Sequence, residues 1–373
     1  MSRDAPITFQ GSRPYTIGVE LELQLLDRRT LDLTQRAEAI LALVPVELGK
    51  RIKPEFIGSM VEINTDICDS LAEVEKDLTA LYRQVEELAG RNDCLLYAAS
   101  LHPFALSRDQ QLSADPRYRR IMDDLQLVGR RFITQGLHVH IGLPDGNTTI
   151  RVCDGIRKYL PILLALSTSS PFFEGYDTGL HSYRAKLFEA LPMAGMPERL
   201  SDWPGFVRIA TLLMETGIIQ EVRDLWWDVR PHPDFGTVEI RICDLPSHFD
   251  EILALVALIR ALVVQLAEEK ESVPESIPAN MQVLRNNKWQ AARYGLEGRF
   301  VDLDGPARRT MREAAHDLIG QVTPVTRELG DESYLAPLEN VIRKGTSTDR
   351  QRRIYGAGKS YAAMITRLRK EFW

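Results

Sequence analysis

Three short segments alternate polar and apolar residues, as a strand with one buried face does. They are residues 15–26, 136–143 and 237–243. Successive side chains of a strand point to opposite faces, so each segment should gather its polar side chains on one face. Because an unpaired buried carboxylate is costly, these polar faces must meet water or a ligand. The pattern predicts a mainly antiparallel sheet with helices on one side and an open cavity on the other.

Long helical stretches separate the strands, which favours an α+β architecture. Further elements are expected as a short strand at 94–99 and helices at 71–90, 115–131, 151–167, 203–219, 251–270 and 307–318. The helix over 115–131 should have a charged outer face, and the helix over 151–167 should be kinked at Pro161. Residues 273–280 are expected to form a loop, and the segment from Arg343 a polar basic loop before a last helix.

Composition limits the class of protein. The chain has 373 residues, 44% of them hydrophobic, and a net charge of −6 with both signs mixed along it. Nucleic acid is not expected as a partner, because a protein that binds it usually shows a basic face. The most apolar long segment, 252–267, is shorter than the roughly 20 residues of a membrane span, so no membrane partner is expected. With no recognisable signal peptide and four widely spaced cysteines, we expect a cytoplasmic protein.

Two pairs of carboxylates are candidate magnesium ligands. Glu20 and Glu22 share one face of the first strand, and like charges so close repel unless a cation lies between them. Glu55 and Glu62 flank Gly58, which permits a turn that aims both carboxylates at one cavity. Carboxylate oxygens are ligands that suit magnesium. For each pair taken alone, an ordinary solvent-exposed strand face remains the alternative.

The segment that contains Glu62 extends this polar face. Asn64 and Asp66 follow Glu62 at a period of two, which predicts a second surface of oxygen ligands. The apolar residues expected on the opposite face are Val61, Ile63 and Ile67.

The other two strands also carry polar pairs. His138 and His140 share a face, and because no third soft ligand stands near, one is expected to assist magnesium or phosphate and not zinc. Glu239 and Arg241 share a face as well, with Arg230 as a further candidate. An arginine beside a metal-binding glutamate suits phosphoryl transfer, because the guanidinium neutralises developing charge. The alternative is a simple cross-strand salt bridge.

Together the three strands predict a pocket for a metal-bound polyphosphate, rich in carboxylates and with a few arginines. Neither of the common glycine-rich nucleotide motifs is present in the sequence. The sequence GAGKS at 356–360 is similar to the end of a phosphate-binding loop, but its first glycine is missing and no strand is expected before it.

These residues occur within motifs that resemble a known family. The motifs are TIGVELELQLLD, SMVEINTDIC, LHPF at 101–104, HVHIG, WWDVRPHPDFGTVEIRICD and NKWQAARYGLEG at 287–298. The chain resembles the glutamate–cysteine ligase type 2 family, of the YbdK-type carboxylate-amine ligases. The resemblance implies a glutamine synthetase-like catalytic core, a curved, mainly antiparallel sheet funnel with helices packed outside, formed by residues 1–373 as a single domain. It also implies amide formation from ATP through an acyl phosphate, with two or three Mg²⁺ ions.

The resemblance assigns roles by position. The implied metal ligands are Glu20, Glu22, Glu55, Glu62, His140 and Glu239. The implied catalytic residues are Arg241, Glu62 and Glu239. Substrate contacts are implied for Arg184, Arg230 and Glu22, and nucleotide contacts for Arg241, Asn287, Arg293 and His138.

Other functions remain open at this point. The substrates are a small carboxylate and an amine, with glutamate and cysteine as the default pair of the family. One alternative is a guanidine or amino-acid kinase, which would stop after phosphate transfer. Another is a nucleotide-binding protein without catalysis. A homodimer is expected, as the commonest assembly of such enzymes.

Overall fold

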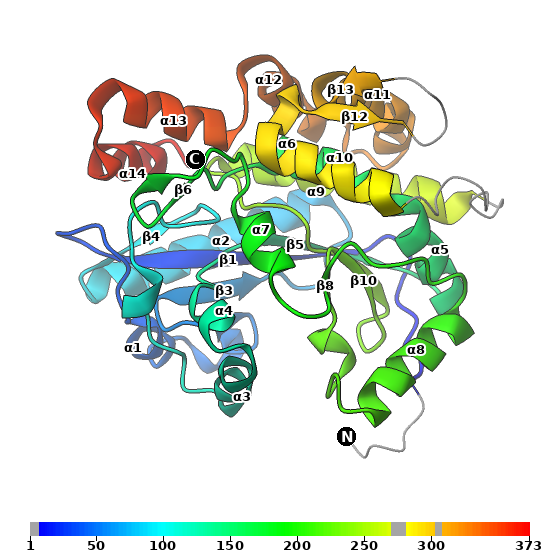
Figure 1. The fold of residues 1–373 in the computed structure, drawn as a ribbon, viewed down its shortest axis with the longest axis horizontal. Helices are drawn as coiled ribbons and strands as arrows, with labels where there is room; N and C mark the ends of the chain where they lie inside the picture. Colours follow the sequence, from blue (N-terminus) through cyan, green and yellow to red (C-terminus); the bar gives the residue numbers. More distant parts are fainter. Residues whose placement is uncertain (1–6, 270–280, 303–307) are drawn as a thin grey trace.

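The computed structural model describes residues 7–269, 281–302 and 308–373 (Figure 1). The loop expected at 273–280 lies outside the described residues.

The centre of the fold is a seven-stranded sheet in the order β10-β11-β5-β1-β3-β2, with β4 also paired to β1. Its strands are β1 Ile17–Asp27, β2 Ile52–Pro54, β3 Met60–Asn64, β4 Cys94–Tyr97, β5 Leu137–Gly142, β10 Val229–His232 and β11 Thr237–Ile240. All of the neighbouring pairs in this sheet run antiparallel. The predicted α+β class with a mainly antiparallel sheet is therefore confirmed.

The alternation read from the sequence decides which face of the sheet is buried. In β1, Val19, Leu21 and Leu23 are at most 1% exposed and belong to the main hydrophobic core, whereas Glu20 and Glu22 alternate with them. The apolar face packs against α2 Leu71–Arg91, which contacts β1, β3 and β4. The N-terminus of α2 is capped by a hydrogen bond from the backbone of Glu73 to the Ser70 hydroxyl.

A second layer of helices covers the core. The long helix α9 Phe249–Glu268 contacts α2 and β5 on one side and α11 Met311–Glu328 and α12 Ala336–Lys344 on the other. Residues 252–267, expected as an amphipathic helix, are buried on almost every side of it, which accords with their apolar sequence. Figure 1 shows α10 Met281–Tyr294, α11 and α12 gathered at the top of the view. Among the residues described, no helix combines the length and apolarity needed to cross a membrane.

Several predicted helices have different boundaries. The expected helix 115–131 is two helices, α3 Pro116–Leu125 and α4 Leu127–Arg130, because Gln126 has a positive φ of 50°. The expected kinked helix 151–167 is also two, α5 Gly146–Ile156 and α6 Leu160–Ser167, and Pro161 lies in the first turn of the second. Proline is tolerated there because its missing N–H would be unpaired in any case.

The C-terminal prediction was wrong. The segment expected as a polar loop from Arg343 forms the end of α12 and most of α13 Ser347–Gly358. A capping box between Thr346 and Asp349 starts α13, a local signal that overrides the polar composition. The GAGKS sequence joins the end of α13 to α14 Tyr361–Lys370, so it follows a helix and is no phosphate-binding loop.

The remaining elements are short connectors around the sheet. The helices are α1 Ala37–Leu41, α7 Arg184–Glu189 and α8 Trp203–Glu215, and short helical turns lie at Val46–Leu48, Ser107–Asp109, Val222–Asp224, Gly295–Glu297 and Glu332–Leu335. The small strands are β6 Phe172–Phe173, β7 Tyr176–Asp177, β8 Ala194–Gly195, β9 Trp226–Trp227, β12 Arg299–Val301 and β13 Arg308–Thr310.

Candidate active site

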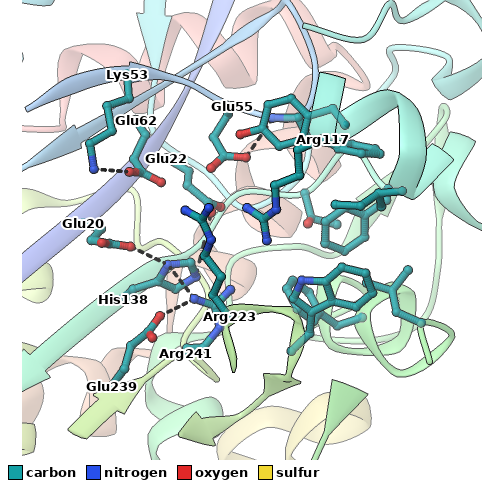
Figure 2. A pocket seen from close by; sticks show the side chains of 18 of the residues that line it. Glu20, Glu22, Lys53, Glu55, Glu62, Arg117, His138, Arg223, Glu239 and Arg241 are labelled. Carbon is teal, nitrogen blue, oxygen red and sulfur yellow. Dashed lines mark hydrogen bonds and ion pairs between the residues drawn. The ribbon is translucent and has the colours of Figure 1, made fainter. Parts of the chain in front are cut away.

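The strand register brings the predicted polar pairs together. Glu20 of β1 lies opposite His138 of β5, and Glu22 lies opposite Glu62 of β3. On the far side of β5, His140 is paired with Glu239 of β11. All of these side chains line one cavity of about 280 Å³ on the polar face of the sheet (Figure 2). The cavity expected from the sequence is therefore present.

The first of two groups of potential metal ligands consists of Glu20, His140 and Glu239, whose ligand atoms lie within 4.8 Å of one another. His140 Nε2 is 3.5 Å from Glu20 Oε1 and 3.9 Å from Glu239 Oε1. The opposite ring nitrogen, Nδ1, lies 3.0 Å from the Thr237 hydroxyl. Among the described residues, His140 Nε2 has no hydrogen-bond partner although it is buried. An imidazole nitrogen aimed at two carboxylates in this way fits a cation between them.

The second group consists of Glu22, Glu55 and Glu62, again with ligand atoms within 4.8 Å of one another. Glu55 follows β2, and the turn between β2 and β3 brings it beside Glu62 as the sequence predicted. The backbone N–H of Gly136 donates to Glu22 over 2.6 Å, and the Asn64 amide donates to Glu62 over 2.7 Å. These bonds fix the carboxylates and leave other oxygen lone pairs for a ligand.

The pKa values of the second group are raised, because three carboxyl groups are crowded in a buried place. Burial raises the pKa of Glu22 to about 7, helped by the charge of Glu62 and opposed by Arg184. Burial, with the charges of Glu22 and Glu62, raises the pKa of Glu55 well above its usual range, and burial beside Glu20 raises the pKa of Glu62. Like charges crowded in a dry site behave so unless a cation neutralises them. The group therefore fits magnesium, which prefers oxygen ligands.

In the first group, the pKa values of the two carboxyl groups are lowered and not raised. Burial alone would raise the pKa of Glu20, but the hydrogen bond with His138 and the nearby His140 ring hold it well below its usual range. Arg230 and Arg241 do the same for the pKa of Glu239. Both carboxylates are thus ionised at neutral pH and ready to bind a cation.

The two histidines differ in charge state. Burial, with the nearby charge of Arg241, lowers the pKa of His138 to about 4, so this ring is neutral. The carboxylates of Glu239 and Glu20 outweigh burial and raise the pKa of His140. A bound cation would displace the proton from His140 Nε2 and reverse that shift.

Two arginines flank Glu239, with different roles. Arg230 Nε donates to Glu239 Oε2 over 2.6 Å, and its Nη1 donates to the carbonyl oxygens of Arg223 and Leu225. These bonds occupy most of its donors, so Arg230 holds Glu239 in place. Arg241 forms an ion pair with Glu239, lies 3.5 Å from His138 Nδ1, and lines the cavity. Its buried Nε has no hydrogen-bond partner in the described chain, so Arg241 keeps donor capacity for a ligand.

Three residues assigned by resemblance lie outside this cavity lining. Arg184 is buried on α7 and donates to the carbonyl oxygens of Arg241 and Ile242, so it supports the strand that carries Arg241. The Asn287 amide exchanges two hydrogen bonds with the backbone of Val301 in β12. Arg293 donates to the carbonyl oxygen of Gly179 and lies over the ring of Tyr294. The ligand contacts implied for Arg184, Asn287 and Arg293 stay predictions; the charge of Arg184 is close enough to Glu22 to oppose the rise in the pKa of that carboxyl.

The prediction that the polar face continues beyond Asn64 to Asp66 was also wrong. The strand β3 ends at Asn64, and Asp66 is exposed and paired with Arg51 at 2.9 Å. Ile67, expected on the apolar face with Val61 and Ile63, is 71% exposed. Side chains alternate between the two faces of a strand only while the backbone stays extended.

Sequence reasoning missed the opposite wall of the cavity. Arg117 and Tyr118 of α3 line it, although the charges of this helix were read as an outward face. Arg117 lies 3.1 Å from Asp224 and 3.3 Å from Glu221. Lys53, 3.7 Å from Glu62, and Arg223 also line the cavity. No local periodicity marks such residues, because they reach the site through tertiary contacts.

A buried cluster supports the strand of Arg241 from behind. Lys288 Nζ lies 2.6 Å from Asp228 and 3.1 Å from Glu189, and the backbone N–H of Arg241 donates to the Asp228 carbonyl oxygen. We expect Lys288→Met to lower the free energy of unfolding by roughly 3–5 kcal/mol, because it leaves Asp228 charged, buried and without its main partner. Urea unfolding measures this. Arg327→Ala, which removes an exposed ion pair, is the control and should change the value little; an equal change in both variants contradicts the prediction.

The pKa shifts of the second group predict how metal and pH act on stability. A carboxyl whose folded pKa lies above the unfolded 4.5 keeps its proton where the unfolded chain has lost it. Without metal, these groups therefore lower stability as pH rises from about 4.5 through about 7, and the full cost persists above that. Magnesium should remove the cost.

Thermal unfolding tests this in chelator and in excess magnesium. The rise in midpoint caused by magnesium should be several-fold larger at about pH 8 than at about pH 5.5. An equal rise at both pH values, or none, would show that the second group does not bind the ion.

The chain resembles known proteins in sequence and in fold. Residues 16–366 match glutamate-cysteine ligase family 2 (GCS2). A protein of Gloeobacter violaceus, named as a candidate glutamate–cysteine ligase 2, is 41% identical over 367 residues, which cover 97% of this chain and 98% of that one. A protein of the same name from Solibacter usitatus is 38% identical over 341 residues, covering 91% and 89%.

Two solved structures share the fold at low sequence identity. The glutamate–cysteine ligase of Francisella tularensis, in complex with AMP, has a TM-score of 0.73 at 13% identity and covers 97% of this chain and 90% of that one. A bifunctional glutathione synthetase from Pasteurella multocida has a TM-score of 0.74 at 14% identity, covering 96% and 52%. Both agree with the fold that the sequence motifs implied.

Proposed function

Because the chain belongs to glutamate–cysteine ligase family 2, as its motifs predicted, we propose that it is an ATP- and magnesium-dependent ligase that joins a carboxylate to an amine through an acyl phosphate. The observation that carries this proposal is the pair of ligand groups on one sheet face, with Arg241 beside Glu239. Two cation sites and an arginine in one cavity suit the transfer of a phosphoryl group from a polyphosphate.

The proposed metal ligands form two sets. Glu20, His140 and Glu239 would hold one ion, and Glu22, Glu55 and Glu62 another. Bound magnesium would neutralise the triphosphate oxygens and orient the phosphate for transfer. We further propose that neutral His138, which lies between Glu20 and Arg241, contacts the nucleotide phosphates, and that Glu22 also faces the substrate.

The chain's own residues would assist two successive steps. In the first, a carboxylate oxygen of the substrate attacks the γ-phosphorus and ADP leaves, while the Arg241 guanidinium stabilises the charge on the transferred phosphoryl group. Glu239, held by Arg230, keeps Arg241 in orientation. In the second, the amine attacks the acyl carbon, phosphate leaves and the nitrogen loses a proton. The enclosing walls of the cavity exclude water that would otherwise hydrolyse the acyl phosphate.

A coupled assay tests the proposal. The purified protein is mixed with ATP, magnesium and glutamate, with and without a panel of amines that includes cysteine, and products are identified by mass. We expect ADP formation that depends on the amine, and a new amide. A phosphorylated product without amide would indicate a kinase, and nucleotide binding without turnover of any pair would indicate a binding protein.

The domain organisation, cellular location and oligomeric state are also proposals. We propose that residues 1–373 act as one catalytic domain, in a cytoplasmic homodimer. Light scattering on the purified protein tests the dimer, since a monomeric mass at working concentration contradicts it.

A further inference from the structure

The cavity has two chemically different walls. Besides the carboxylates, it is lined by a set of aromatic side chains, called here the aromatic wall: Phe56, Tyr118, Phe132, Phe188 and Trp226. Apolar surface that faces a cavity is stabilised when an apolar ligand group covers it.

The rings of the aromatic wall pack against one another. Four of them touch edge to face: Phe56 with Tyr118 at 5.5 Å between centroids, Phe56 with Phe132 at 6.1 Å, and Phe132 with Phe188 at 4.8 Å. With Trp226, the rings come from five separate parts of the chain: the turn after β2, helix α3, the segment before β5, helix α7 and strand β9. Such packing fixes the rings in position, as a specificity surface requires.

The aromatic wall adjoins the second group of carboxylates. Phe56 directly follows Glu55, and its backbone N–H donates to the Glu55 carboxylate over 2.8 Å. Tyr118, Phe132, Phe188 and Trp226 are only partly buried, whereas core rings such as Phe206 are fully buried. A ligand whose reacting end lies at the carboxylates would therefore place its other end on these rings.

The chemistry of the aromatic wall favours the amine over the carboxylate substrate. An amine attacks in its uncharged form, which apolar surroundings favour. Arg117 and Arg223 also line the cavity, and both form ion pairs with Glu221, while Arg117 and Arg120 share Asp224. Part of their charge is thus already compensated, so a second anionic group gains less here than from an unpaired arginine. The carboxylate to be activated instead needs Arg241, which lies beside Glu239 of the first ligand group.

We propose that the aromatic wall selects, as amine substrate, a compound with a bulky aromatic or branched apolar group, in preference to one as small as cysteine. This inference rests on the proposed function. Each apolar methylene that the wall buries adds roughly fourfold in affinity, so an aromatic side chain should gain roughly 10- to 100-fold over a methyl group.

Calorimetry tests the selection without turnover. Two matched pairs, 2-phenylethylamine with ethylamine and phenylalanine with alanine, are titrated alongside cysteine into protein that holds magnesium and a non-hydrolysable ATP analogue. The aromatic member of at least one pair should bind roughly 10- to 100-fold more tightly than its partner and than cysteine. The pair that responds shows whether the amine also carries a carboxylate. Equal binding within both pairs, or tighter binding of cysteine, overturns the inference.

Variants then locate the effect. Phe132→Ala should weaken binding of the preferred aromatic amine about tenfold and leave the affinity for the ATP analogue within about twofold. Phe188→Leu, which removes a ring but keeps apolar bulk, serves if Phe132→Ala fails to fold. Leu212→Ala on the outer face of α8, where Leu212 is 58% exposed, is the control and should change neither affinity. Loss of nucleotide binding instead would assign the aromatic wall to the nucleobase and overturn the inference.

ADP formation separates the two proposals. Faster amide formation with ethylamine or cysteine than with the aromatic amines would overturn the selection and leave the ligase standing. Selective binding of the aromatic amine with no ADP formed from any amine would support the selection and contradict the ligase.

Discussion

Replacing Arg241 by alanine should lower the rate of amine-dependent ADP formation by about 10³-fold or more, because an arginine that neutralises charge on a transferring phosphoryl group contributes that much. Arg241 is the cationic side chain of the cavity that both contacts Glu239 and keeps an unpaired buried Nε in the described chain. The measurement is the steady-state rate at saturating ATP and magnesium.

The control is Arg241→Lys. Lysine keeps the positive charge but loses the planar donors, so it should restore part of the rate. Both variants should keep the circular dichroism spectrum of the unmodified protein. A folded Arg241→Ala protein whose rate is within tenfold of the original would contradict the role assigned to Arg241.

Glu62→Gln should have two effects of opposite sign. It should lower the rate of ADP formation by about 10²-fold or more, because a neutral amide is a poor magnesium ligand. In chelator it should raise the thermal unfolding midpoint, because it removes one of three crowded carboxylates whose pKa values are raised by burial and mutual repulsion.

The combination separates a crowded functional carboxylate from a structural one. A purely structural glutamate would lose stability on substitution, whereas relief of burial and repulsion at Glu62 should raise it. The exposed Glu47→Gln is the matched control and should change neither the rate nor the midpoint. A lower midpoint for Glu62→Gln in chelator would contradict the account of the second group.

The site was predictable from the sequence where the chain is extended. A period of two placed Glu20 with Glu22, His138 with His140, and Glu239 with Arg241 on single faces, and the register then aligned them. The spacing of residues along the sequence does not show which strands pair. However, three strands of one sheet that each carry a polar face can keep these faces solvated most simply by lining one shared cavity. The turn at Gly58 likewise fixed the approach of Glu55 to Glu62.

Elsewhere the sequence was insufficient, for physical reasons. Phe132 and Tyr118 reach the cavity from a segment interrupted at Gln126, where a left-handed backbone conformation has no periodic signature. Arg184 carries a charge that suggested a substrate contact, whereas in the fold it lies outside the cavity lining and donates to the backbone carbonyls of Arg241 and Ile242. The polar tail is helical because of a capping box and tertiary packing, which composition does not report.

The most direct test of ligation through an acyl phosphate follows oxygen. The carboxylate substrate is prepared with a heavy oxygen isotope in both carboxylate positions, and the phosphate released during amide formation is analysed by mass. We predict one labelled oxygen in each phosphate, because that oxygen bonds to the γ-phosphorus in the first step and leaves with it in the second. Amide formation with unlabelled phosphate would contradict the proposed mechanism.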